Sequence, residues 1–146
     1  MTSLIERLWL ADNLPIQDGL YRADGAAYGV RVDASAEGGL KILAPFILEE
    51  FLSLHPDMVT SIDTTLEKPL PHGDGYLCCG EGSYGSEGFF GRLDQHRNLV
   101  WVVYLENYNP FIDASISNTS ATFTSSTGVS ITVNLGTSEF GRRVDG

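Results

Sequence analysis

The stretch Leu99–Leu105 constrains the fold more than any other part of the chain. It reads LVWVVYL and is apolar at every position. Neighbouring side chains on a strand point to opposite faces, so a strand of this kind needs a protein layer on each side. One face would carry Leu99, Trp101, Val103 and Leu105, and the other Val100, Val102 and Tyr104. The stretch therefore predicts a central strand of a sheet that is covered on both faces.

The residues that follow this strand alternate between apolar and hydroxyl side chains. Such alternation is typical of strands with one buried and one solvent-exposed face, and the segments SNTS and SSTG are typical turns. We expect consecutive meander strands here. The inward positions are Ile112, Ala114, Ile116, Ala121, Phe123, Val129, Ile131, Val133 and Leu135. The outward positions are Ser115, Ser117, Thr122, Thr124, Ser130, Thr132 and Asn134.

The beginning of the chain predicts a short helix and a hairpin. Ser3 and Glu6 have the spacing of a capping box, and the helical pattern stops at Leu14-Pro15. Residues 26–43 contain alternating apolar positions on either side of the turn-forming segment ASAEGG. We therefore expect two paired strands after the helix.

A second helix is predicted from Pro45, with Pro56 ending it. The segment EKPLPHGDG is rich in proline and glycine and predicts a loop. Residues 1–146 fit a single domain, whose size allows an ordinary hydrophobic core. The predicted fold is α+β, an antiparallel meander sheet with two helices packed against it.

Charge and chain composition narrow the classes of partner. Nineteen acidic residues stand against nine Lys and Arg, for a formal net charge of -10. This charge disfavours nucleic acid and anionic membranes as partners and favours a cationic one, although an acidic surface also serves solubility. Glu6 and Arg7 interrupt the apolar run that a signal peptide needs, and no segment has transmembrane length. We expect a cytoplasmic protein.

The two cysteines, Cys78 and Cys79, are adjacent. On a strand they would face opposite ways, which suits neither a disulfide framework nor a shared metal site. We expect reduced, buried thiols, with a vicinal disulfide switch as the alternative. The three histidines are widely spaced, without a ligand partner at a metal-binding interval, so we expect no metal and no cofactor.

A Gly-x-Gly-x-x-Gly pattern occurs at Gly80, Gly82 and Gly85. A dinucleotide site needs a helix directly after this pattern, but the chain continues with SEGFFG, and Glu81 lies where phosphate charge would have to fit. The pattern instead predicts a turn between strands, with glycines supplying positive φ or close backbone approach. Tyr84, with carboxylates beside it, has the composition of a contact loop or of a mobile surface loop.

No catalytic constellation is evident, and we expect no enzyme. A serine triad with Asp94 and His96 lacks the strand-turn-helix motif that would support it. A carboxylate pair drawn from Glu81, Glu87 and Glu106 has no specific support.

Leu99, Trp101, Glu106, Asn109, Pro110 and Phe111, followed by a Ser/Thr-rich hairpin with Gly128 near its turn, give the last third of the chain a resemblance to a known group. This part resembles the immunity proteins of bacterial polymorphic toxin systems, of the contact-dependent inhibition and Rhs type. The resemblance implies a protein that binds and neutralises a cognate toxin domain. An acidic inhibitor would suit a basic nuclease toxin, because complementary charge speeds encounter and selects the partner.

On this hypothesis the contacts with the toxin domain come from acidic and aromatic residues near the glycine pattern and the end of the central strand. The candidates are Asp74, Tyr76, Glu81, Tyr84, Glu87, Glu106 and Tyr108. Two alternatives stay open. A small-molecule binder or enzyme would be marked by a deep polar cavity with a buried, perturbed carboxylate. A structural subunit would use the flat Ser/Thr face.

Overall fold

The computed structural model describes residues 2–141. The helices are α1 (Leu4–Leu10) and α2 (Leu48–Leu54), with short 3-10 turns η1 (Glu37–Gly39) and η2 (Pro71–Gly73). The first strands are β1 (Asn13–Pro15), β2 (Gly19–Arg22), β3 (Ala27–Val32), β4 (Leu40–Phe46) and β5 (Val59–Pro69). The later strands are β6 (Tyr76–Gly82), β7 (Gly88–Leu93), β8 (Leu99–Leu105), β9 (Phe111–Ser117), β10 (Ser120–Ser125) and β11 (Ser130–Asn134).

The strands form two antiparallel sheets, so the α+β class is confirmed. The large sheet has eight strands in the order β1-β5-β6-β7-β8-β2-β3-β4, and the small sheet has the order β11-β10-β9. A single meander is not confirmed, because β8 pairs with β2 instead of β9. Strands that are consecutive in the chain do pair within β5 to β8, β2 to β4 and β9 to β11. After β8 the chain leaves the large sheet, and β9 begins the small sheet as a second layer.

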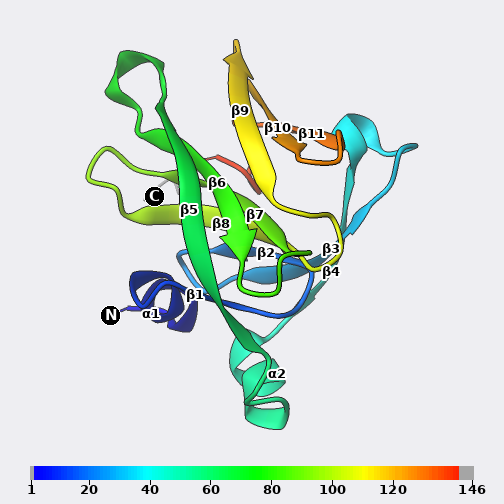
Figure 1. Ribbon diagram of the computed structural model, residues 1–146. Coiled ribbons are helices and arrows are strands. Elements are labelled where there is room, and N and C mark those ends of the chain that lie inside the picture. The colour runs from blue at the N-terminus through cyan, green and yellow to red at the C-terminus, as the bar shows by residue number, and fades with distance from the viewer. Residues whose placement is uncertain (1, 142–146) are drawn as a thin grey trace.

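Strand β8 lies inside the large sheet and is covered on both faces, as predicted. In Figure 1 the small sheet lies above the large sheet, and the two helices lie below it. Trp101 and Val103 belong to the core between the large sheet and the small sheet, whereas Val102 and Tyr104 belong to the core between the large sheet and the helices. Two cores therefore share one strand.

The predicted parity fails at the start of β8. Leu99 lies in the core between the large sheet and the helices, and Val100 packs toward the small sheet. The sequence predicts the opposite face of the sheet for each of these two residues. The pairing of β7 with β8 skips Val100, because Arg92 pairs with Trp101 and Leu93 pairs with Leu99. One extra residue in a strand reverses the faces of the residues before it.

A second irregularity corrects the prediction for Ile112, whose side chain is 55% exposed. The pairing of β9 with β10 skips Ile112 between Phe111 and Asp113, so Phe111 takes the inward place instead. The other fully buried inward residues of the small sheet are Ala114, Ala121, Phe123 and Ile131.

Both predicted helices form, with shifted ends. The capping box of Ser3 and Glu6 is present, but α1 ends at Leu10, with Ala11 as its C-cap, and Leu14 belongs to β1. Helix α2 begins at Leu48, later than predicted, because Pro45 is still part of β4.

The hairpin predicted over residues 26–43 is confirmed as the pair β3 and β4. Strands β1, β2 and β5 were not predicted. Strand β5 continues to Pro69 and so includes the start of the segment for which the sequence predicts a loop.

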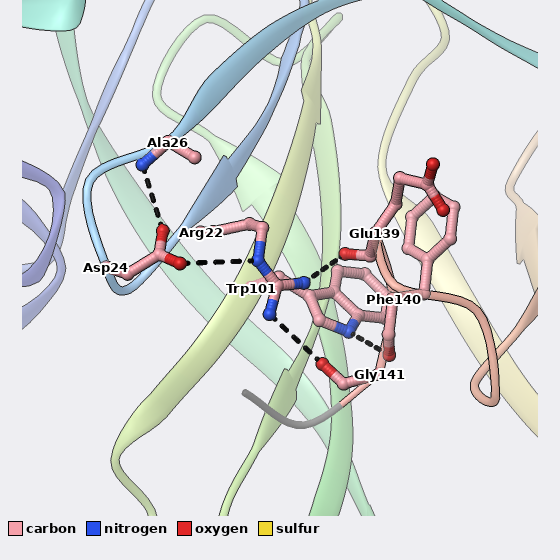
Figure 2. A network of polar contacts seen from close by, with 7 residues as sticks. All are labelled: Arg22, Asp24, Ala26, Trp101, Glu139, Phe140 and Gly141. Atoms are coloured by element: carbon pink, nitrogen blue, oxygen red, sulfur yellow. Dashed lines mark hydrogen bonds and ion pairs between the residues drawn. The ribbon is translucent and has the colours of Figure 1, made fainter. Parts of the chain in front are cut away.

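The C-terminal segment, residues 139–141, lies against Arg22 and Trp101 (Figure 2). Arg22 is 7% exposed, and its guanidinium donates to the carbonyl oxygens of Glu139 and, at 3.2 Å, Gly141. Trp101 Nε1 donates to the carbonyl oxygen of Phe140 at 2.8 Å, and the two rings meet edge to face. Main-chain acceptors from the segment thus satisfy two buried donors.

Candidate functional site

The Gly-x-Gly-x-x-Gly pattern forms the hairpin between β6 and β7, so the prediction of a turn is confirmed. Gly85 has φ +82°, which the turn requires. A Cβ at Gly80 would lie 2.0 Å from the carbonyl oxygen of Asp63 on β5. A Cβ at Gly82 would lie 2.4 Å from Oε1 of Glu87. The second glycine therefore makes room for a carboxylate.

Glu87 is buried, with 1% of its surface exposed. Its Oε1 accepts hydrogen bonds from the backbone N–H of Tyr84 at 3.0 Å and from the hydroxyl of Thr60 at 3.3 Å. Its Oε2 accepts from the hydroxyl of Tyr104. These contacts join the hairpin turn to β5 and β8, and hydrogen bonds to a carboxylate are stronger than neutral ones.

Two further groups extend this network. The hydroxyl of Ser83 lies 2.8 Å from that of Thr60, and the Ser83 N–H donates to the same oxygen at 3.3 Å. Burial raises the pKa of Tyr104 well above its ordinary value, and the hydrogen bond to Glu87 raises it further. The phenol therefore keeps its proton and remains a donor to the carboxylate.

A pocket of about 330 Å³ opens beside this network. Its lining residues come from the end of β1, the entry to β5, the hairpin turn and the end of β8. They are Ile16, Asp57, Met58, Tyr84, Ser86, Glu87 and Glu106. The lining combines acidic and apolar side chains, and it includes no Lys, Arg or His.

Carboxylates outside the pocket add to the negative charge at this end of the sheet. Asp63 on β5 is the direct cross-strand partner of Glu81 on β6, and like charges in that position repel. Asp18 accepts a hydrogen bond from the backbone N–H of Glu106 at 2.8 Å. Burial raises the pKa of Asp18, the Glu106 N–H bond opposes this rise, and the Glu106 charge adds to it.

The described residues form ion pairs at other places. They include Arg22–Asp24, Arg31–Asp33, Lys68–Asp113 and Arg97–Glu67. None of them includes a carboxylate of the pocket or the pair Asp63 and Glu81. Within residues 2–141, this end of the sheet therefore carries acidic charge that no ion pair neutralises.

The structure brings part of the predicted contact set together. Tyr84, Glu87 and Glu106 line one pocket, and Tyr84 is 71% exposed. Tyr108 is close to them, because the backbone N–H of Asn109 donates to Ser86 at 2.9 Å. Glu81 lies on the same hairpin and lines a second depression together with Ser83 and Gly85. We call these residues, with Asp57 and Asp63, the acidic end.

Glu87 differs from the other candidates in its burial. Its side chain is buried and holds the hairpin turn in place, and it borders the surface only where it lines the pocket. Gly82 and Tyr104 create that site, and neither is distinguishable in the sequence from an ordinary turn residue and an ordinary core residue.

Asp74 and Tyr76 do not join the acidic end. Tyr76 begins β6, and Asp74 precedes it at the end of η2. The hairpin turn follows the last residue of β6, Gly82, about 20 Å away at the usual rise of a strand. The guanidinium of Arg97 lies 4.2 Å from the centre of the Tyr76 ring, and Arg97 also pairs with Glu67 at 2.8 Å. Tyr76 thus already has a cation within the chain.

Sequence reasoning missed Asp57, Met58 and Ile16 as pocket residues. Ile16 follows the three-residue strand β1, and Asp57 and Met58 precede the long strand β5, neither of which the sequence predicted. The backbone N–H of Ile16 donates to the carbonyl of Met58 at 2.8 Å, which brings the two chain segments together. Only recognition of β5 and its partner β1 would have revealed this meeting point.

The remaining sequence candidates lie away from the pocket. Cys78 and Cys79 are buried free thiols on opposite faces of β6, in different cores. Burial raises the pKa of Cys79 to about 11, and raises that of Cys78 further. Among residues 2–141, no group of three or more His, Cys, Asp or Glu side chains is arranged to hold a metal ion.

The helices of the described chain are too short, and not apolar enough, to cross a membrane. The comparisons with known proteins add no relative: no family model, no curated protein and no solved structure matches this chain.

Proposed function

We propose that this protein is a binding protein whose acidic end docks a basic protein partner. The observation that carries the proposal is Tyr84, an aromatic side chain 71% exposed at the tip of a hairpin and surrounded by carboxylates. Aromatic side chains are enriched at protein interfaces and often act as their anchors. The Glu87 network holds the turn in place before binding, which lowers the entropy cost of docking.

The partner that we propose is a bacterial toxin domain, so that the protein acts as an immunity protein in the cytoplasm and not as an enzyme. The net charge of -10 favours a basic target such as a nuclease domain. Carboxylates at the acidic end would cover the cationic surface that such a domain uses to hold phosphates. The resemblance of the last third of the chain to immunity proteins supports the same proposal.

A second candidate function is the binding of a small ligand. The pocket of about 330 Å³ contains a buried carboxylate and lies beside a tyrosine of raised pKa, which are features of ligand sites. This candidate needs no protein partner. Substitution of the same pocket residues tests it, because such variants should lose binding of the ligand.

The proposal is tested with the product of the gene beside that of this protein. We expect 1:1 binding, measured by calorimetry, that weakens as salt is raised. Reversal of two charges, half-buried Glu81→Lys with exposed Glu106→Lys, should weaken this binding at least about tenfold at physiological salt. Glu87 is unsuitable for reversal, because a buried lysine there would disrupt the fold.

The matched control is Glu49→Lys with Glu50→Lys on α2, where both side chains are exposed. This double variant changes the net charge by the same amount at a different place. It should bind within about twofold of the unmodified protein once salt screens long-range attraction. Equal loss in both double variants would mean that net charge matters and that the acidic end does not; absence of any binding would refute the proposal.

A further inference from the structure

We infer that the pocket at the acidic end takes a single alkyl cation, the guanidinium or ammonium group of an arginine-like or lysine-like ligand together with its aliphatic stem. The inference deepens the proposed function by naming the group that enters. The inference rests on the proposed function if a protein partner supplies the cation, and it is independent of that function if the cation is a free ligand.

The first support is the mixed chemistry of the lining. Ile16 and Met58 supply apolar surface, and Tyr84 supplies an aromatic side chain. Arginine and lysine place an aliphatic stem along apolar surface and a charged group at its end, and cations bind favourably to aromatic faces. An anionic ligand would meet three carboxylates and no cation in the same space.

The second support is the buried carboxylate of Glu87. It is 1% exposed, it lines the pocket, and within residues 2–141 it forms no ion pair. Its three hydrogen bonds come from neutral donors, two on Oε1 and one on Oε2. A carboxylate has about four acceptor positions, so one position on Oε2 is left. A buried negative charge without a cation is costly, and a cation in the pocket would reduce that cost.

The third support is the position of the two exposed carboxylates. Asp57 and Glu106 line the pocket together with Glu87, but they come from different parts of the chain. A cation with several N–H donors can therefore meet carboxylates on more than one side. The volume of about 330 Å³ is at the small end of ligand pockets and suits one side chain better than a nucleotide-sized cofactor.

The test is an NMR titration of the 15N-labelled protein with n-butylguanidinium chloride and n-butylammonium chloride. We expect saturable shifts of the amides of Tyr84, Ser86, Glu87 and Glu106, with a Kd on the order of millimolar for so small a ligand. Two matched salts serve as controls. Guanidinium chloride lacks the stem, and KCl reproduces the ionic strength, so neither should give the same saturable shifts.

Variants separate pocket binding from general attraction. Glu106→Gln is exposed and should raise the Kd at least about threefold, whereas Glu49→Gln on α2 should leave it unchanged. Glu87→Gln keeps the shape and one acceptor oxygen, and it should raise the Kd further. If Glu87→Gln does not fold, Glu106→Gln still decides. The inference is overturned if the pocket amides do not shift, if KCl shifts them equally, or if Glu106→Gln binds unchanged.

A competition arm identifies the source of the cation. If n-butylguanidinium weakens binding of the neighbouring gene product, the partner supplies the side chain. If n-butylguanidinium binds and that protein does not, the inference stands and the proposed function fails, with a free cation as the ligand. If the partner binds while the pocket takes no cation, the proposed function stands and the inference is overturned.

Discussion

Two buried charged side chains, Arg22 and Glu87, lie in different parts of this molecule, and their charges are compensated in different ways. Arg22 is covered by the chain itself, because the carbonyl oxygens of Glu139 and Gly141 accept its N–H groups (Figure 2). Asp24 adds a carboxylate 3.8 Å from its Nε. Glu87 is held only by neutral donors and lines an open pocket.

The difference shows how a structural charge can be separated from a candidate functional one. Buried charges cost free energy unless the protein neutralises or solvates them. At Arg22 a main-chain segment and a carboxylate supply that compensation. At Glu87 the compensation is incomplete within the described residues, and space beside it can admit a cation.

Phe140→Ala should have the largest effect on stability. The ring is 7% exposed and meets Trp101 edge to face with the ring centres 5.0 Å apart. Its removal should lower the free energy of unfolding by about 3 kcal/mol, measured by urea denaturation. Ser138→Ala, an exposed neighbour, should change it little. A loss below about 1 kcal/mol would mean that the C-terminal segment does not close this core.

Glu87→Ala should come next, with a loss of about 2 kcal/mol in the same measurement. The substitution leaves the N–H of Tyr84 and the hydroxyl of Tyr104 without their acceptor. Glu87→Gln keeps an acceptor and should cost less than Glu87→Ala. Equal losses for both variants would show that the charge, and not the hydrogen-bond acceptor, holds the hairpin turn.

Asp18→Asn should have a smaller effect that depends on pH. Burial raises the pKa of Asp18 in the folded protein above its ordinary value of 3.8. Ionised Asp18 therefore opposes folding. The stability linked to its protonation is complete below pH 3.8 and is lost as pH rises through the folded pKa.

The side-chain amide that replaces the carboxylate in Asp18→Asn can still accept the N–H of Glu106 but carries no charge. We expect this variant to unfold at a higher urea concentration than the unmodified protein at pH 7, and at the same concentration at pH 3. A destabilised variant at pH 7 would mean that the hydrogen bond outweighs the burial of the charge.

The smallest expected effect is in the reactivity of the thiols, which should be very low in the native protein. Cys78 and Cys79 are buried on opposite faces of one strand, with pKa values raised by burial, to about 11 for Cys79. Native protein at pH 8 should react very slowly with a disulfide reagent such as DTNB, while urea-unfolded protein should release both thiols at once. Fast reaction of native protein would favour the vicinal disulfide switch instead.

Much of the fold could be predicted because hydrophobic period and capping act locally. The doubly apolar stretch Leu99–Leu105 correctly predicted a buried strand covered on both faces. The exceptions, Val100 and Ile112, lie where pairing with the neighbouring strand skips a residue. A bulge depends on both strands, so the sequence of one strand does not reveal it.

The candidate site was predictable only in part. Tyr84, Glu87 and Glu106 were proposed from composition, and the structure places them around one pocket. Asp74 and Tyr76 are close to them in sequence but lie at the other end of β6, because an extended strand separates its ends. The burial of Glu87 depends on Gly82 and Tyr104, which come together only in the folded sheet.

The most direct test of the acidic end as an interface is hydrogen exchange, followed by mass spectrometry, of the complex with the neighbouring gene product. We predict slower exchange in peptides covering residues 82–88 and 105–109, which include Tyr84 and Glu106, and unchanged exchange around Arg22 and Phe140. Slower exchange at the C-terminal segment or along β4, with none at residues 82–88, would contradict this interface.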